Sequence, residues 1–198
     1  METKFAIFDV DCRERTKCGT GFSYRSRVKP IGDKVDQLHA IAKEKQVRIV
    51  FTTCCDGRML KPGESDDILF VPTDGTDTGW LERLSQSRVI YLDKKAWHNV
   101  ADDIKHVAWD MFLHNGNATR LFRELNIPHW VVFGNGVDLC VSSGIKGIIK
   151  AGYKVTILED VLISSAQGTP ETMENTIVQM CELGAERKSL AQFLDEMK

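Results

Sequence analysis

The stretch WVVFGNGVDLCVSSGIKGIIKAGYKVTILED, residues 130–160, decides the fold class of this 198-residue chain. It begins with a continuous apolar run, passes through a glycine-rich turn and a helical pattern, and ends in a second run rich in β-branched residues. A strand, a helix and a second strand in this order predict a right-handed βαβ unit. Because both apolar runs are continuous rather than alternating, we expect strands that are buried on both faces of a parallel sheet.

Further apolar runs and helical patterns extend this arrangement toward the N-terminus. The runs occupy residues 4–10, 47–53 and 88–92. Apolar residues spaced by three and four positions mark helices at 35–42 and 118–125. We therefore expect residues 1–198 to form one α/β domain, with a doubly wound, three-layer α/β/α fold around a mostly parallel sheet of about six strands.

The composition argues against several classes of partner. The formal net charge is -2, with both signs mixed along the chain, so no basic stripe is available for nucleic acid. No apolar run approaches the roughly 18 to 20 residues that cross a bilayer, so we expect no membrane association. The six cysteines form no CxxC pair and no signal peptide is recognisable, which predicts reduced thiols and a cytoplasmic protein.

Cys140 lies where the glycine-rich turn of the opening stretch enters the predicted helix. The N-terminus of a helix presents unpaired N–H groups and the positive end of the dipole, so it lowers a cysteine pKa and can hold an oxyanion. A cysteine in this place is also compatible with simple packing. The residues expected at the carboxyl ends of neighbouring strands, where active sites of parallel sheets form, are Asp9, Thr52, Lys94 and Gly134.

The chain resembles the isochorismatase-like cysteine hydrolases over nearly its whole length. The family pattern G-V-A-T-D-x-C-V reads here GNGVDLCV, residues 134–141, and a later G-Y-x-V reads GYKV, residues 152–155. FAIFDVDC, residues 5–12, takes the place of the family's first strand. DGTDTGWLERLSQSRVIYLDK, residues 74–94, is similar to the stretch that leads into a strand ending in lysine.

This resemblance implies an Asp-Lys-Cys triad. Carried over to this sequence, Cys140 is the nucleophile, Asp9 is the base, and Lys94 is the cation that steadies the thiolate and the carboxylate. Asp11 becomes a loop residue at the edge of the site. The implied oxyanion hole consists of the backbone N–H groups of Gly136 and Cys140. A cis peptide bond is implied between Asn135 and Gly136.

The assignment of the triad lysine has alternatives. Lys95 is adjacent to Lys94 at the end of the same predicted strand. The family's next element, x-A-x-D-x-F, occurs twice in this chain, and in its second register Lys105 falls close to the expected place. We interpret residues 97–108 as an insertion after Lys94.

The resemblance also bears on the substrate pocket and on metal binding. It implies a pocket shaped by Trp97, Trp109 and Phe112, although aromatic residues are more often part of a core than of a pocket wall. The metal-binding nicotinamidases of the family carry Asp and His after the second strand, whereas this chain has Cys54 and Asp56 there. We therefore expect no metal and no other cofactor.

The predicted function is a metal-independent cysteine hydrolase that cleaves an amide-type or imide-type C–N bond of a small molecule. An isochorismate-type C–O hydrolase and a non-catalytic relative that only binds a small molecule remain alternatives. A magnesium-dependent, haloacid-dehalogenase-like phosphatase is a further alternative, based on Asp9 and Asp11, but Arg13 departs from its motif. Because family members are commonly dimers or tetramers, we expect a homo-oligomer.

Overall fold

The sheet at the centre of the protein accounts for most of its strands. A computed structural model describes residues 5–15, 22–24, 26–53, 67–94 and 110–197. Its sheet has seven strands in the order β5-β6-β4-β1-β7-β8-β9, and each neighbouring pair is parallel. The strands are β1 (Ala6–Val10), β4 (Ile49–Thr52), β5 (Ile68–Val71), β6 (Val89–Leu92), β7 (His129–Asn135), β8 (Lys154–Ile163) and β9 (Glu186–Lys188).

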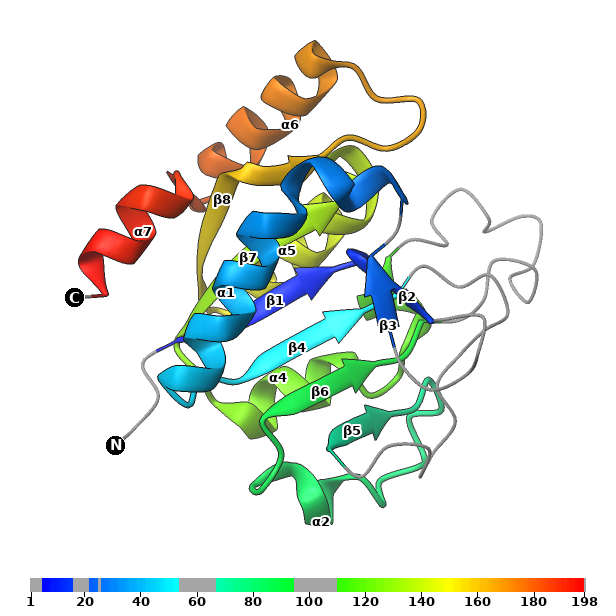
Figure 1. The fold of residues 1–198 in the computed structure, drawn as a ribbon. Helices are drawn as coiled ribbons and strands as arrows, with labels where there is room; N and C mark the ends of the chain where they lie inside the picture. Colours follow the sequence, from blue (N-terminus) through cyan, green and yellow to red (C-terminus); the bar gives the residue numbers. More distant parts are fainter. Residues whose placement is uncertain (1–4, 16–21, 25, 54–66, 95–109, 198) are drawn as a thin grey trace.

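Helices cover both faces of this sheet (Figure 1). The first face packs against η1 (Ser26–Ile31), α1 (Gly32–Glu44) and α7 (Leu190–Glu196). The second packs against α2 (Leu81–Leu84), α3 (Met111–His114), α4 (Ala118–Leu125), α5 (Ser142–Lys150) and α6 (Pro170–Glu182). The predicted three-layer α/β/α fold is confirmed, with seven strands instead of about six.

Two hydrophobic cores follow from the alternation of side chains along each strand. In β1, Phe8 and Val10 belong to the core beneath α4 and α5, whereas Ile7 belongs to the core beneath α1. The face that a strand residue occupies therefore depends on whether its position is odd or even.

Three local features shape the edge of the sheet where the strands end. The short strands β2 (Arg13–Arg15) and β3 (Phe22–Tyr24) pair in antiparallel fashion just after β1. Between β7 and α5 the chain forms one turn of π-helix, η4 (Val137–Val141), where the sequence predicts the start of an α-helix. Among the described residues, no helix combines the length and the apolar character that crossing a membrane requires.

Candidate active site

A lysine, a carboxylate and a thiol meet at the carboxyl ends of β6, β1 and β7. The Lys94 Nζ donates a hydrogen bond to Asp11 Oδ2 at 2.8 Å and lies 3.3 Å from Cys140 Sγ. The side chains of Lys94 and Asp11 are only 6% and 1% exposed, while Cys140 is partly exposed. The ammonium group thus bridges a buried carboxylate and a thiol that solvent can reach.

Asp11 is held in one orientation by its neighbour on β4. Its backbone N–H donates to the carbonyl of Thr52 at 3.2 Å, and the Thr52 hydroxyl donates to Asp11 Oδ1 at 2.9 Å. The φ of Asp11 is 55°, in the left-handed region that Asp tolerates better than most residues. This conformation turns the chain at the end of β1, and both carboxylate oxygens have a partner.

Asp9 takes a different place from the one that we predicted beside the thiol. Its Oδ2 lies 3.0 Å from His39 Nε2 on α1 and 3.6 Å from Arg13 Nε. Asp9 shares the parity of Ile7, so it faces α1 across the sheet from α5. Burial raises the pKa of Asp9, and the charge of Arg13 opposes this shift. The predicted location of Asp9 is wrong in this structure, and Asp11 is a buried partner of the lysine rather than an edge residue.

The backbone at Gly136 also differs from the prediction. Among the described residues, which include Asn135 and Gly136, no peptide bond is cis. The Gly136 N–H donates to the carbonyl of Ile163 at 2.8 Å, so it is engaged within the protein and does not face an oxyanion. A Cβ at Gly136 would lie 4.0 Å from Cys140 Sγ, which indicates that this glycine borders the thiol. The Cys140 N–H stays a predicted oxyanion donor.

Comparisons with known proteins identify the fold that carries this site. No protein-family model and no curated protein matches the chain. Among solved structures, an isochorismatase-like hydrolase from Alkaliphilus metalliredigens has a TM-score of 0.61 and 16% identity, covering 100% of this chain and 98% of that chain. The chain has the isochorismatase-like hydrolase fold. The resemblance to isochorismatase-like hydrolases that the sequence predicts is therefore confirmed for the fold.

Two other structures of this fold are similar to the chain over most of its length. A cysteine hydrolase from Pseudomonas syringae pv. phaseolicola 1448A has a TM-score of 0.62 and 15% identity, covering 98% of this chain and 92% of that chain. A nicotinamidase from Staphylococcus aureus has a TM-score of 0.61 and 18% identity, covering 94% of this chain and 99% of that chain. At these identities the comparison concerns the fold, and the activity has to be argued from the site.

Asp138 is a residue of the isochorismatase-like motif to which we had assigned no role. Its carboxylate accepts hydrogen bonds from the backbone N–H and the hydroxyl of Ser165, at 2.6 and 2.5 Å. Ser165 lies in the connection between β8 and α6. Asp138 therefore ties the turn that carries Cys140 to the connection after β8, and only the motif itself could have pointed to it.

The predicted pocket aromatics have mixed outcomes. Trp97, Trp109 and the insertion 97–108 lie outside the described residues. The ring of Phe112 lies over Gly147 of α5, where a Cβ would come within 2.1 Å of it, and it lies 5.2 Å from the ring of Phe122. These are core contacts, so they do not support the predicted pocket role of Phe112.

The remaining alternatives for the lysine and the metal fall partly outside the structure. Lys95, Lys105, Cys54 and Asp56 lie outside the described residues. Within the described residues, no group of three or more His, Cys, Asp or Glu side chains is arranged to hold a metal ion.

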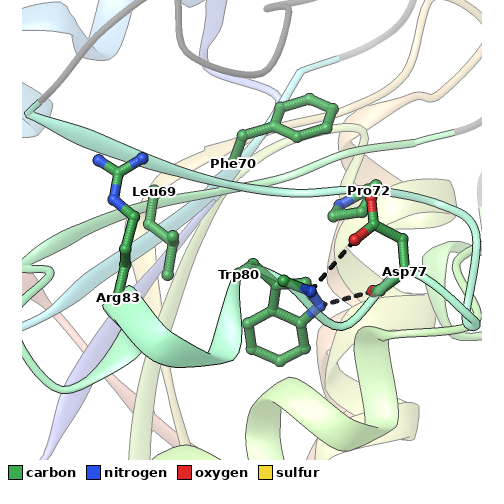
Figure 2. Close-up of a pocket in the computed structure, with 7 residues that line it drawn as sticks. Leu69, Phe70, Pro72, Asp77, Trp80 and Arg83 are labelled. Atoms are coloured by element: carbon green, nitrogen blue, oxygen red, sulfur yellow. Dashed lines mark hydrogen bonds between the residues drawn. The ribbon is translucent and has the colours of Figure 1, made fainter.

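A separate pocket of about 200 Å³ lies between the edge strand β5 and α2. It is lined by Leu69, Phe70, Pro72, Asp77, Gly79, Trp80 and Arg83. Figure 2 shows the Trp80 ring below β5, with its N–H directed at the Asp77 carbonyl 3.1 Å away. This volume is below the roughly 300 to 1,000 Å³ of most ligand sites. None of the residues that line this pocket belongs to the group of Lys94, Asp11 and Cys140.

Asp93, next to the bridging lysine, gives a prediction for stability against pH. Burial raises the pKa of Asp93 from 3.8 to about 6. Between these values the folded protein keeps a proton that the unfolded chain releases, so Asp93 makes folding less favourable as pH rises through this window. As pH rises through this window, an Asp93→Asn variant should therefore gain stability relative to the wild type. The gain in free energy of unfolding should reach up to about 3 kcal/mol. Urea denaturation from pH 4 to 7.5 measures this; a pH-independent difference would contradict it.

Proposed function

We propose that the protein is a metal-independent cysteine hydrolase that cleaves an amide-type or imide-type C–N bond of a small molecule. The observation that carries the proposal is the position of Lys94 Nζ, 2.8 Å from Asp11 Oδ2 and 3.3 Å from Cys140 Sγ. Solved structures with this fold include proteins named cysteine hydrolase and nicotinamidase, which supports hydrolysis in general and C–N bonds in particular.

The electrostatics of the three residues favour a reactive thiolate. A cation close to sulfur stabilises the thiolate over the thiol, and the thiolate is the nucleophile. Lys94 and Asp11 are both buried, so each would be costly alone, but their contact and the hydroxyl of Thr52 compensate for the desolvation. The arrangement therefore holds a charged lysine beside Cys140 without exposing it to solvent.

The chemistry that follows has two halves. The Cys140 thiolate attacks the carbonyl carbon, a C–S bond forms, and the carbonyl oxygen becomes an oxyanion near the Cys140 N–H. Collapse of this intermediate breaks the C–N bond, and the leaving nitrogen takes up the proton that the thiol gave to Asp11. Water then attacks the thioester while Asp11 accepts its proton, and the products are a carboxylic acid, an amine or amide, and the free thiol. Asp11 thus takes the role first predicted for Asp9.

A non-catalytic binding protein is the second candidate, because one predicted oxyanion donor is engaged elsewhere. The Gly136 N–H is bonded to the Ile163 carbonyl, which leaves the Cys140 N–H to hold the oxyanion. The phosphatase alternative loses its geometric basis, since Asp9 faces His39 while Asp11 pairs with Lys94. A homo-oligomer stays a prediction, which light scattering on the purified protein tests.

The test uses a panel of small amides and imides with acid quenching and mass spectrometry of the peptide that contains Cys140. We expect turnover, an acyl adduct on that peptide, and at least tenfold faster alkylation of Cys140 than of Cys181 by iodoacetamide at pH 7. Cys181 is a suitable reference because it is also partly exposed. A Cys140→Ala variant should lose turnover and a Cys181→Ala variant should keep it. Turnover that survives Cys140→Ala, or a Cys140 that labels no faster than Cys181, would refute the proposal.

A further inference from the structure

A buried chain of hydrogen bonds lies directly behind Lys94. The Tyr91 hydroxyl donates to Asp93 Oδ1 at 2.9 Å, and it lies 3.2 Å from the Thr53 hydroxyl on the other side. The backbone N–H of Lys94, the next residue along the chain, is near enough to the Asp93 carboxylate to oppose the rise in its pKa. Asp93 is only 3% exposed. The residue that directly precedes the bridging lysine is therefore held through its buried carboxylate by a tyrosine.

The backbone of Asp93 is fixed as firmly as its side chain. Its N–H donates to the carbonyl of Val71 on β5 at 3.0 Å, and its carbonyl accepts the side-chain amide of Asn115 at 2.7 Å. Asn115 is buried as well. The segment at the end of β6 is thus held at three points of Asp93: its backbone N–H, its backbone carbonyl and its carboxylate.

Tyr91 and Asp93 act from the opposite face of the sheet to the thiol. Tyr91 packs with Phe51, whereas Leu92 belongs to the core beneath α4 and α5, on the side where Cys140 packs. Asp93 has the parity of Tyr91, and Lys94 has that of Leu92. Asp93 is therefore placed to act on the reaction only through the main chain of Lys94.

The position of the lysine backbone matters because the side chain is long. Four methylene groups give lysine many rotamers, so the place of its Cα decides whether the ammonium group reaches both partners. A misplacement of about 1 Å in a catalytic group can cost on the order of 100-fold in rate. Burial also raises the pKa of Asp93, so retaining a carboxylate here works against stability at neutral pH.

We propose that Asp93 and Tyr91 form a positioning pair that fixes the main chain at Lys94 and so keeps its ammonium group between Asp11 and Cys140. The inference rests on the proposed function, in which Lys94 supports a reactive Cys140. It adds two residues that the Asp-Lys-Cys arrangement does not contain. Both are positioning residues, since neither contacts the reacting atoms.

The experiment follows the alkylation of Cys140 by iodoacetamide as a function of pH, which requires no knowledge of the substrate. Asp93→Leu removes the acceptor, Tyr91→Phe removes only its hydroxyl donor, and Asp93→Asn retains one acceptor oxygen. We expect Asp93→Leu to raise the pH of half-maximal labelling by about 0.5 to 1 unit, toward the value of Lys94→Met. Tyr91→Phe should shift this pH in the same direction, and Asp93→Asn should retain most of the wild-type profile.

Steady-state kinetics give a second readout. With any substrate from the panel, kcat should fall about tenfold in Asp93→Leu while KM changes less than twofold.

A control is Tyr153→Phe, which removes the hydroxyl of a tyrosine that is partly buried elsewhere in the fold. That hydroxyl donates to the Phe122 carbonyl at 3.2 Å, outside the site, so its loss should leave the labelling profile unchanged. If Asp93→Leu does not fold, Tyr91→Phe decides the question alone. A wild-type profile in folded Tyr91→Phe and Asp93→Leu, together with a shift in Lys94→Met, would overturn this inference and leave the proposed function standing. No shift in Lys94→Met would refute the proposed function itself.

Discussion

Replacing Asp11 with Asn is expected to lower kcat by about 10² to 10⁴-fold, whereas the same change at Asp9 should lower it by less than about tenfold. An amide at position 11 can neither accept the proton of the thiol nor balance the charge of Lys94, which lies 2.8 Å from the present carboxylate. An amide at position 9 faces His39 on the other side of the sheet. The two variants form a matched pair, since they carry one substitution at two buried carboxylates of the same segment.

The measurement is steady-state kinetics on any substrate of the amide panel, with circular dichroism to verify that both variants fold. The rate of Cys140 alkylation at pH 7 gives a second readout, and it should fall in Asp11→Asn only. An inactive Asp9→Asn beside an active Asp11→Asn would restore the assignment made from the sequence and contradict the geometry at the end of β1.

The sequence could not distinguish these two carboxylates, for a physical reason. In an extended strand, residues 9 and 11 face the same side of the sheet, so periodicity treats them as equivalent, and only the resemblance to the family pattern favoured Asp9. The structure separates them because Asp11 adopts a φ of 55° and turns toward Thr52 and Lys94. A left-handed aspartate depends on contacts with strands far along the chain, and nothing in FAIFDVDC records them.

Other parts of the site differ in how visible they are in the sequence. Cys140 and Lys94 could be located because a buried strand followed by a glycine-rich turn, and a strand ending in lysine, are local patterns. The engagement of the Gly136 N–H could not, since its partner Ile163 is 27 residues away. The bond between the Tyr91 hydroxyl and the Asp93 carboxylate was equally hidden, because a sequence does not reveal which buried polar groups will meet. The fold was predictable since it follows from runs of apolar residues, whereas the site depends on single hydrogen bonds.

The second large effect concerns Gly134, where the sheet brings β7 against β1. Gly134 has a φ of +143°, and a Cβ there would lie 2.0 Å from the carbonyl oxygen of Val10. The obstacle is backbone of the central strand, which cannot move aside as a flexible side chain can. Gly134→Ala therefore combines overpacking with backbone strain, and we expect it to destabilise the protein by more than about 4 kcal/mol. Because domains have only about 5 to 15 kcal/mol of stability, much of this variant should be unfolded or insoluble.

Gly152→Ala is the control that separates strain from collision. Gly152 also has a positive φ, +90°, but apart from the adjoining backbone no atom lies within 4 Å of the place where its Cβ would be. Its cost should therefore be the left-handed penalty alone, about 1 to 2 kcal/mol, measured by urea denaturation alongside the wild type. Equal costs for the two variants would mean that the contact between Gly134 and Val10 is not rigid. A larger cost at Gly134 would indicate that β7 can lie this close to β1 because position 134 has no side chain. The turn that carries Cys140 follows directly after β7, and β1 leads to Asp11. The close pairing of these two strands therefore helps to bring both residues to Lys94.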